Sequence, residues 1–167
     1  MILRGRAHRF GDDVNTDYII SGKYKFKTLD MKELAMHVME DLDPDFYNKV
    51  RPGDFIVAGR NFGCGSSREQ APLAIKYADI AAVLASSFAR IFYRNAINTG
   101  LPVVEVDTSR IEDGDELEVD LSKGKVVNIT RDEEITAKPL PSVMIKILND
   151  GGLANHIKKN KGFALED

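Results

Sequence analysis

Residues 55–78 read FIVAGRNFGCGSSREQAPLAIKYA, the most informative stretch of this chain. The first five of these residues form a short apolar run that favours a β-strand and ends on glycine, whereas residues 69–78 have helical composition and spacing. The segment NFGCGSSRE, residues 61–69, is therefore predicted to lie on a turn from a strand to a helix. Glycines, two adjacent hydroxyls and an arginine meet at this turn, so we expect a ligand site there.

The chemistry of this turn favours a small carboxylated molecule. Unpaired N–H groups and the helix dipole place partial positive charge at a helix N-terminus. Ser66 or Ser67 can cap the helix and face a ligand. Arg68 can bind a carboxylate with two parallel N–H groups, and Gly65 permits a positive φ and close backbone approach. An ordinary capping box, with Ser66 as N-cap and Glu69 at N3, is the alternative interpretation.

Composition predicts one soluble domain covering residues 1–167. A content of 43% hydrophobic and 29% charged residues is ordinary for a globular protein, and a net charge of −3 gives no reason to expect nucleic acid as a partner. No apolar stretch approaches the roughly 20 residues that a membrane span needs, and the first residues lack a signal-peptide core. We therefore expect a cytoplasmic protein without membrane contact.

The residues that commonly bind metals do not form a recognisable site. Cys64 is the single cysteine, so internal disulfides are excluded, and one thiolate cannot hold an iron–sulfur cluster, which usually takes several. His8 and His37 have no partners at a spacing diagnostic of metal ligation, and we expect both to be structural. The sequence therefore predicts that this chain binds no metal of its own.

The order of predicted elements indicates an α/β fold. Strands at 55–59, 81–85 and 101–106 alternate with helices at 67–78 and 87–98, a pattern that implies a parallel core with right-handed crossovers. The remaining predicted elements are a strand at 2–10, a helix at 31–39 capped by Asp30, short β runs at 116–121, 125–130 and 134–137, and helices at 141–148 and up to residue 159. The ligand edge is predicted at the carboxyl end of the strand at 55–59.

Four segments carry a family resemblance that spans nearly the whole chain. They are FGDDVNTD at 10–17, NFGCGSSRE at 61–69, SFARIFYRNAINTGLP at 87–102 and GGL at 151–153. Together they resemble the small subunits of the aconitase-like hydro-lyases, chiefly isopropylmalate isomerase and archaeal-type homoaconitase. The resemblance implies the swivelling β/β/α domain that forms the last domain of single-chain aconitases, with a mixed sheet core, flanking helices and β-rich appendages.

The resemblance also implies a reaction and roles for individual residues. Such enzymes remove water from a hydroxy di- or tricarboxylate and add it back at the neighbouring carbon. Ser66 occupies the position of the family's catalytic serine base, a role that needs positive charge and N–H donors around the alkoxide. Ser67 would donate a hydrogen bond to substrate, beside Gly65, and Arg68 would pair with a substrate carboxylate. Asp17 matches the family's Thr-Asp loop carboxylate, which orients groups at the active site.

A cofactor and a partner follow from the same resemblance. The reaction uses a [4Fe-4S] cluster, and because this chain has only Cys64, the cluster is expected on a separate large subunit. The active enzyme is then expected to be a heterodimer or heterotetramer. The isolated chain is expected to be colourless and inactive.

Substrate choice is expected in the segment GKYKFKT, residues 22–28, where Tyr24, Lys25, Phe26 and Lys27 are candidate substrate-binding residues. In the family, apolar residues here suit an isopropyl group, and an arginine suits the extra carboxylate of homoaconitate. Phe26 in the pocket favours isopropylmalate, whereas Lys25 or Lys27 in the pocket favours another carboxylate. Because arginine is absent and lysine is a poorer bidentate partner, isopropylmalate is the favoured substrate. Homoaconitate, and then another methylated malate, are the alternatives.

Two further classes of function are compatible with the residues. A non-catalytic module could bind a small anion at residues 66–68. A structural interaction protein is the third possibility, but it leaves the polar glycine-rich turn unexplained. A cluster-bearing partner protein would distinguish the hydro-lyase subunit from both.

Overall fold

The computed structural model describes residues 1–24 and 30–162, and one sheet of seven strands forms the centre of this described part. The strands are β1 (Ile2–Arg9), β2 (Phe55–Ala58), β3 (Ala82–Ala85), β4 (Val103–Glu105), β5 (Glu116–Asp120), β6 (Lys125–Asn128) and β7 (Glu133–Thr136). Their order in the sheet is β4-β3-β2-β1-β5-β6-β7. The strand β1 pairs in parallel with β2 and antiparallel with β5, so it joins a parallel half to an antiparallel half.

The burial of side chains along the strands differs between the parallel and the antiparallel half of the sheet. Every residue of β2 and β3 is buried, as expected for parallel strands covered on both faces. In β5, Leu117 and Val119 are buried while their neighbours are only partly covered, the alternation expected when one face meets solvent. The predicted α/β fold with a mixed sheet is confirmed, and the β-rich appendages continue the main sheet through β1.

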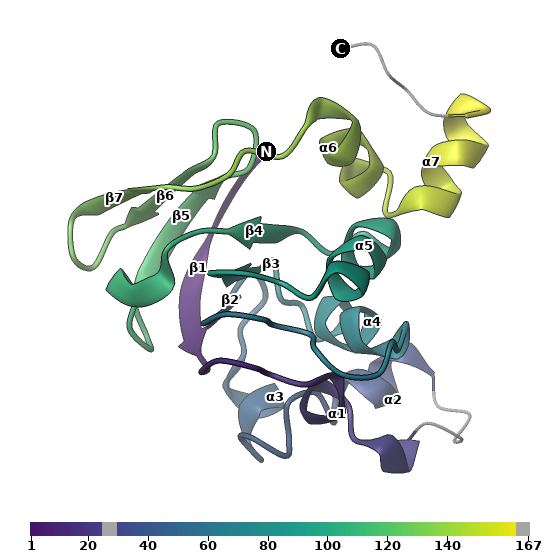
Figure 1. The fold of residues 1–167 in the computed structure, drawn as a ribbon, viewed down its shortest axis with the longest axis horizontal. Coiled ribbons are helices and arrows are strands. Elements are labelled where there is room, and N and C mark those ends of the chain that lie inside the picture. Colours follow the sequence, from purple (N-terminus) through teal and green to yellow (C-terminus); the bar gives the residue numbers. More distant parts are fainter. Residues whose placement is uncertain (25–29, 163–167) are drawn as a thin grey trace.

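The helices lie mainly beside the parallel half. They are α1 (Thr16–Ile19), α2 (Met31–Ala35), α3 (Phe46–Lys49), α4 (Gln70–Tyr77), α5 (Arg90–Thr99), α6 (Ser142–Asn149) and α7 (Leu153–Asn160), with 3₁₀ turns η1 (Gly22–Tyr24) and η2 (Thr108–Arg110). Helix α5 contacts α4, α6 and α7. These four helices lie together on one side of the molecule, away from β6 and β7 (Figure 1). None of the helices in the described ranges is long and apolar enough to cross a membrane.

The first predicted helix is shorter than expected. Its cap is confirmed, because the Asp30 carboxylate accepts the Glu33 N–H at 2.8 Å. The helix ends at Ala35 rather than at residue 39. Met39 has a φ of +58°, and its N–H donates to the Ile19 carbonyl at 2.9 Å, so a tertiary hydrogen bond replaces a helical one.

A buried carboxylate fixes the amino end of β2. Asp54 accepts backbone N–H groups of Arg6 at 3.1 Å and Arg51 at 3.0 Å. It also accepts a ring N–H of His8 at 2.8 Å, which supports the structural role predicted for that histidine. Burial alone would raise the pKa of Asp54, but the hydrogen bonds to its charged form outweigh burial and hold the pKa below its ordinary value.

Candidate active site

Three loops meet beyond the carboxyl ends of the parallel strands. They are residues 10–15 after β1, residues 59–69 after β2 and residues 86–89 after β3. The first two loops are joined by backbone hydrogen bonds, including Gly63 N–H to the Val14 carbonyl at 2.8 Å. Because parallel strands place their carboxyl ends at one edge, segments far apart in sequence converge there. The predicted turn therefore lies at the predicted ligand edge.

Two glycines allow loop 59–69 to pack against its neighbours. Gly63 has a φ of +83°, and a Cβ at this position would lie 2.2 Å from Cγ of Phe92. Gly65 has a φ of +89°, and a Cβ there would lie 2.6 Å from the amide nitrogen of Asn15. Both positions combine a left-handed backbone with close packing, so only glycine fits without displacement.

The helix after this loop begins later than predicted, and the predicted serine caps are wrong. Helix α4 begins at Gln70, its N-cap is Glu69, and no side chain caps it. Neither Ser66 nor Ser67 can therefore serve as N-cap, and the capping-box interpretation is also wrong. The physical reason is tertiary, because the Ser66 carbonyl accepts the Thr16 hydroxyl at 2.6 Å instead of a helical N–H.

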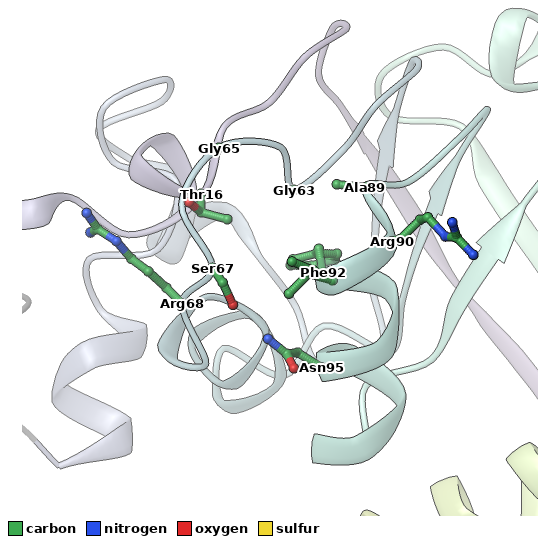
Figure 2. Close-up of a pocket in the computed structure, with 10 residues that line it drawn as sticks. Thr16, Gly63, Gly65, Ser67, Arg68, Ala89, Arg90, Phe92 and Asn95 are labelled. Carbon is green, nitrogen blue, oxygen red and sulfur yellow. The ribbon is translucent and has the colours of Figure 1, made fainter.

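Ser66 lies at the rim of a cavity. Its two neighbours, Gly65 and Ser67, both line this cavity, which has a volume of about 360 Å³ and suits a small molecule. Figure 2 shows the Ser67 and Asn95 side chains pointing toward one another across it. Ser66 itself is exposed, and no hydrogen bond joins its hydroxyl to another described residue. Its hydroxyl is thus open to solvent and to a ligand.

Arg68 and Asp17, predicted separately as site residues, form an ion pair. Nη2 of Arg68 lies 2.5 Å from Oδ1 of Asp17, and Nη1 donates to the Ile20 carbonyl at 3.4 Å. The Arg68 side chain is 12% exposed and that of Asp17 is 53% exposed. Figure 2 shows the Arg68 side chain extending away from Ser67 and Asn95. Arg68 thus lines the cavity, and its guanidinium extends toward Asp17 of α1.

The Arg68 guanidinium also reaches the start of the segment predicted to select substrate. A Cβ at Gly22 would lie 3.5 Å from Nη2 of Arg68, so the guanidinium packs against η1. The Nε atom of Arg68 is buried and has no hydrogen-bond partner among the described residues. An arginine that keeps a donor unpaired retains capacity to bind an acceptor such as a carboxylate.

Tyr24 is held by two residues that sequence reasoning did not connect with the site. Its hydroxyl donates to Oε1 of Glu40 at 2.8 Å and lies 2.9 Å from Nδ1 of His37. The rings of Tyr24 and His37 stack with centroids 4.2 Å apart. Burial and the hydrogen bond to Glu40 raise the pKa of the Tyr24 hydroxyl, which stays protonated at neutral pH. His37 was predicted to be structural, and no sequence spacing signals its contact with Tyr24.

Three predicted substrate-binding residues, Lys25, Phe26 and Lys27, lie outside the described residues. Tyr24 is the last described residue before them. Their predicted contacts with a substrate therefore stay a prediction.

Thr16, Asn15 and Asn95 are site residues that sequence reasoning missed. Thr16 is 2% exposed and donates its hydroxyl to the Ser66 carbonyl, and Asn15 caps α1 by accepting the Asp17 N–H at 2.8 Å. Each lies inside one of the quoted motifs, and Asn15 and Thr16 lie within two residues of Asp17. Closeness to Asp17 in the sequence was the signal that could have identified Asn15 and Thr16 as site residues.

The described residues do not fit an iron–sulfur cluster or a metal ion. Among residues 1–24 and 30–162, no group of three or more His, Cys, Asp or Glu side chains could hold a metal. Cys64 offers one partly buried thiol.

Comparisons with known proteins identify the family of this chain. The model of the aconitase C-terminal domain matches residues 18–108, more than half of the chain, including the end of α1 and the loop after β2. This chain belongs to the aconitase C-terminal domain family. The family resemblance inferred from the four sequence segments is thereby confirmed.

Relatives of this aconitase C-terminal domain protein match almost end to end. The 3-isopropylmalate dehydratase small subunit 2 of Archaeoglobus fulgidus is 63% identical over 160 residues, covering 96% of this chain and 97% of the relative. The methanogen homoaconitase small subunit of Methanothermobacter thermautotrophicus is 56% identical over 158 residues, covering 95% and 92%. The crystal structure of 3-isopropylmalate dehydratase from Methanocaldococcus jannaschii superposes with a TM-score of 0.92 at 54% identity, covering 96% of both chains. The predicted fold is confirmed by this likeness.

Proposed function

We propose that this chain is the small subunit of a two-subunit hydro-lyase that interconverts 2-isopropylmalate and 3-isopropylmalate in leucine biosynthesis. The observation that carries the proposal is 63% identity, over nearly the full length of both chains, to a protein named as a 3-isopropylmalate dehydratase small subunit. An exposed serine at the rim of a cavity, with an arginine two residues on, supplies a base and a carboxylate-binding group.

Ser66 is the proposed base. Its alkoxide takes a proton from the carbon beside a substrate carboxylate, hydroxide leaves the neighbouring carbon, and the alkene forms. Returning the proton and a hydroxide to the alkene, each at the carbon that the other had left, gives the isomer. Thr16 fixes the Ser66 backbone, and Ser67 is proposed to donate a hydrogen bond to substrate beside Gly65. The departure of hydroxide is assigned to the large subunit, where we also place the [4Fe-4S] cluster.

Arg68 is the proposed anchor for a substrate carboxylate. Asp17 holds its guanidinium against α1, and the Nε donor has no hydrogen-bond partner among the described residues. Asp17 acts as a positioning residue in this scheme, because its contact is with Arg68. The guanidinium packs against η1, so the anchored carboxylate would lie close to η1.

Residues 24–27 are proposed to contact the variable substituent of the substrate. This segment has no arginine, the residue best suited to pair with a second carboxylate, and it includes Phe26. The isopropyl substituent is therefore favoured. Homoaconitate is the first alternative, supported by a relative named as a homoaconitase small subunit, and another methylated malate is the second.

The test is anaerobic reconstitution with the large subunit, followed by hydration assays with isopropylmaleate and with homoaconitate. The Ser66→Ala variant should lower kcat by a factor of about 10² to 10⁴, the contribution typical of a general base. Ser122→Ala, which changes an exposed serine near β6, is the matched control and should leave kcat unchanged. Activity on homoaconitate alone would reassign the substrate. Activity on neither would favour a non-catalytic anion-binding module.

A further inference from the structure

One wall of the cavity belongs to helix α5, and no residue of the proposed mechanism lies on it. Ile91, Phe92 and Asn95 line the cavity from this helix. Residues three and four apart share one face of a helix, so these side chains form a single stripe, in which Asn95 is the polar member. We propose that Asn95 binds the substrate carboxylate that Arg68 does not hold, an inference that rests on the proposed function.

The side chain of Asn95 has no evident structural task. Asparagine is a poor helix former, yet Asn95 lies in the middle of α5. Its backbone carbonyl accepts the Thr99 hydroxyl at 2.8 Å, whereas its side-chain amide has no hydrogen-bond partner among the described residues. The residue is also partly buried, so water reaches the amide mainly through the cavity. A ligand in the cavity would supply the missing acceptor for its two N–H donors.

The serine opposite Asn95 also has a donor to offer. Figure 2 shows the Ser67 side chain pointing toward Asn95 across the cavity. No hydrogen bond joins the Ser67 hydroxyl to another described residue, so one O–H and two N–H donors line the same space. A carboxylate has two oxygens that accept several hydrogen bonds, and it can therefore be bound from both walls at once.

The charges around the cavity favour an anion. Arg68 and Arg90 line it, and its described lining residues include no aspartate or glutamate. Asp17 partly neutralises Arg68, whereas Arg90 is exposed and forms no ion pair with another described residue. Figure 2 shows the Arg90 side chain extending away from Ser67 and Asn95. Arg90 therefore contributes positive potential, and the direct contact on this wall is left to Asn95.

A substrate with two carboxylates needs two sets of donors. The candidate alkenes are all derivatives of maleate, with one carboxylate on each carbon of the double bond. Arg68 is the proposed anchor for the first of these. Figure 2 shows the Arg68 and Ser67 side chains leaving the loop in different directions, with Asn95 on the side of Ser67. The pair of Ser67 and Asn95 is thus placed to hold the second carboxylate.

The test measures kcat and KM of the reconstituted two-subunit enzyme with the alkene that the wild type hydrates. Asn95→Leu keeps the approximate size and removes both donors, and Asn95→Asp replaces them with a charge that repels the substrate. Asn95→Leu should raise KM by about 10-fold to 100-fold, the effect of losing a hydrogen bond to a charged group, and Asn95→Asp should raise it further. The carboxylate is present in substrate and transition state alike, so kcat should change by less than about threefold.

Asn98→Asp is the matched control. Asn98 is partly buried on the same helix, about one turn farther along, and does not line the cavity. The same change of charge there should leave KM within about twofold of the wild-type value. Thermal unfolding separates binding from structure, because leucine is the better helix former and Asn95→Leu should unfold at an equal or higher Tm. A lower Tm together with a lower kcat would mark a structural role and overturn the inference.

An unchanged KM in both Asn95 variants would also overturn the inference. If the wild-type enzyme hydrates neither isopropylmaleate nor homoaconitate, the proposed function fails, and calorimetric titration of the full chain with maleate then tests the site by itself. Maleate binding that is weakened by Asn95→Asp and kept in Asn98→Asp would support the carboxylate site without the enzyme reaction. No binding, or equal binding to all three proteins, would overturn it.

Discussion

Thr16→Val isolates the hydrogen bond that holds the proposed base. The Thr16 hydroxyl donates to the Ser66 carbonyl at 2.6 Å, and valine replaces that hydroxyl with a methyl group of similar size. The backbone N–H of Thr16 still donates to the Cys64 carbonyl at 2.8 Å, so loops 10–15 and 59–69 stay joined. The substitution therefore removes one side-chain hydrogen bond and leaves the backbone hydrogen bond between the two loops unchanged.

The magnitude follows from the surroundings of the two groups. Leaving a buried acceptor without its donor costs about 1–3 kcal/mol of unfolding free energy. Ser66 is exposed, so water can reach its carbonyl region, and we expect a value near the lower limit, about 1 kcal/mol. Misplacing a catalytic group by about 1 Å can lower the rate by about 10²-fold. We expect kcat to fall by about 10-fold to 100-fold with little change in KM.

Thr108→Val is the matched control. Thr108 is also 2% exposed, and its hydroxyl donates to the Ala58 carbonyl at 2.7 Å, away from Ser66. Denaturant unfolding of the isolated chain should show that both variants are less stable. Steady-state kinetics of the reconstituted enzyme should show a kcat loss for Thr16→Val alone. Full kcat in Thr16→Val, or an equal loss in Thr108→Val, would refute the positioning role.

Three further substitutions test other features. Gly63→Ala should lower the free energy of unfolding in urea by about 2–5 kcal/mol, because the alanine would have a positive φ and its Cβ would clash with Phe92. A loss below about 1 kcal/mol would contradict the close contact between Gly63 and Phe92. The folded-state pKa of Asp54 is lowered, so its stabilisation is present above the unfolded pKa near ~3.9 and is lost as pH falls through the folded pKa. The difference in unfolding free energy between wild type and Asp54→Asn should accordingly shrink below about pH 4, and a difference independent of pH would be evidence against this linkage. Asp17→Asn should lower kcat/KM by about tenfold through Arg68 while changing stability by less than about 1 kcal/mol, because the Asp17 side chain is half exposed. An unaltered kcat/KM would remove Asp17 from the site.

The elements around loop 59–69 could be predicted from sequence because their signals are local. Apolar runs mark β2, β3 and β4 to within two residues of their observed ends, and glycine or proline stands beside the runs of β2 and β4. The order of strands and helices then indicates a parallel half. The continuation through β5 could not be derived locally, because it depends on pairing between residues more than 100 positions apart.

The errors at the site have a common physical origin in tertiary hydrogen bonds. The local sequence pattern predicted Ser66 as a helix cap, but its carbonyl accepts a hydrogen bond from Thr16, 50 residues away. The spacing of apolar residues also predicted that the helix at 31–39 continues to Met39, whose N–H donates to the Ile19 carbonyl instead. His37 looked like an isolated histidine because Tyr24 lies 13 residues away in the sequence, with α2 between the two residues.

The place of β1 within the sheet has a consequence for how this protein is made. The strand β1 leaves the ribosome before both of its partners, Phe55–Ala58 on one side and Glu116–Asp120 on the other. At about 5–20 residues per second, the second partner emerges several seconds or more after β1. Until then one edge of β1 offers unpaired N–H and C=O groups to any other nascent chain. Chains that terminate before residue 116 would keep that edge open permanently and should aggregate, even though every residue of loops 10–15 and 59–69 has already been synthesised.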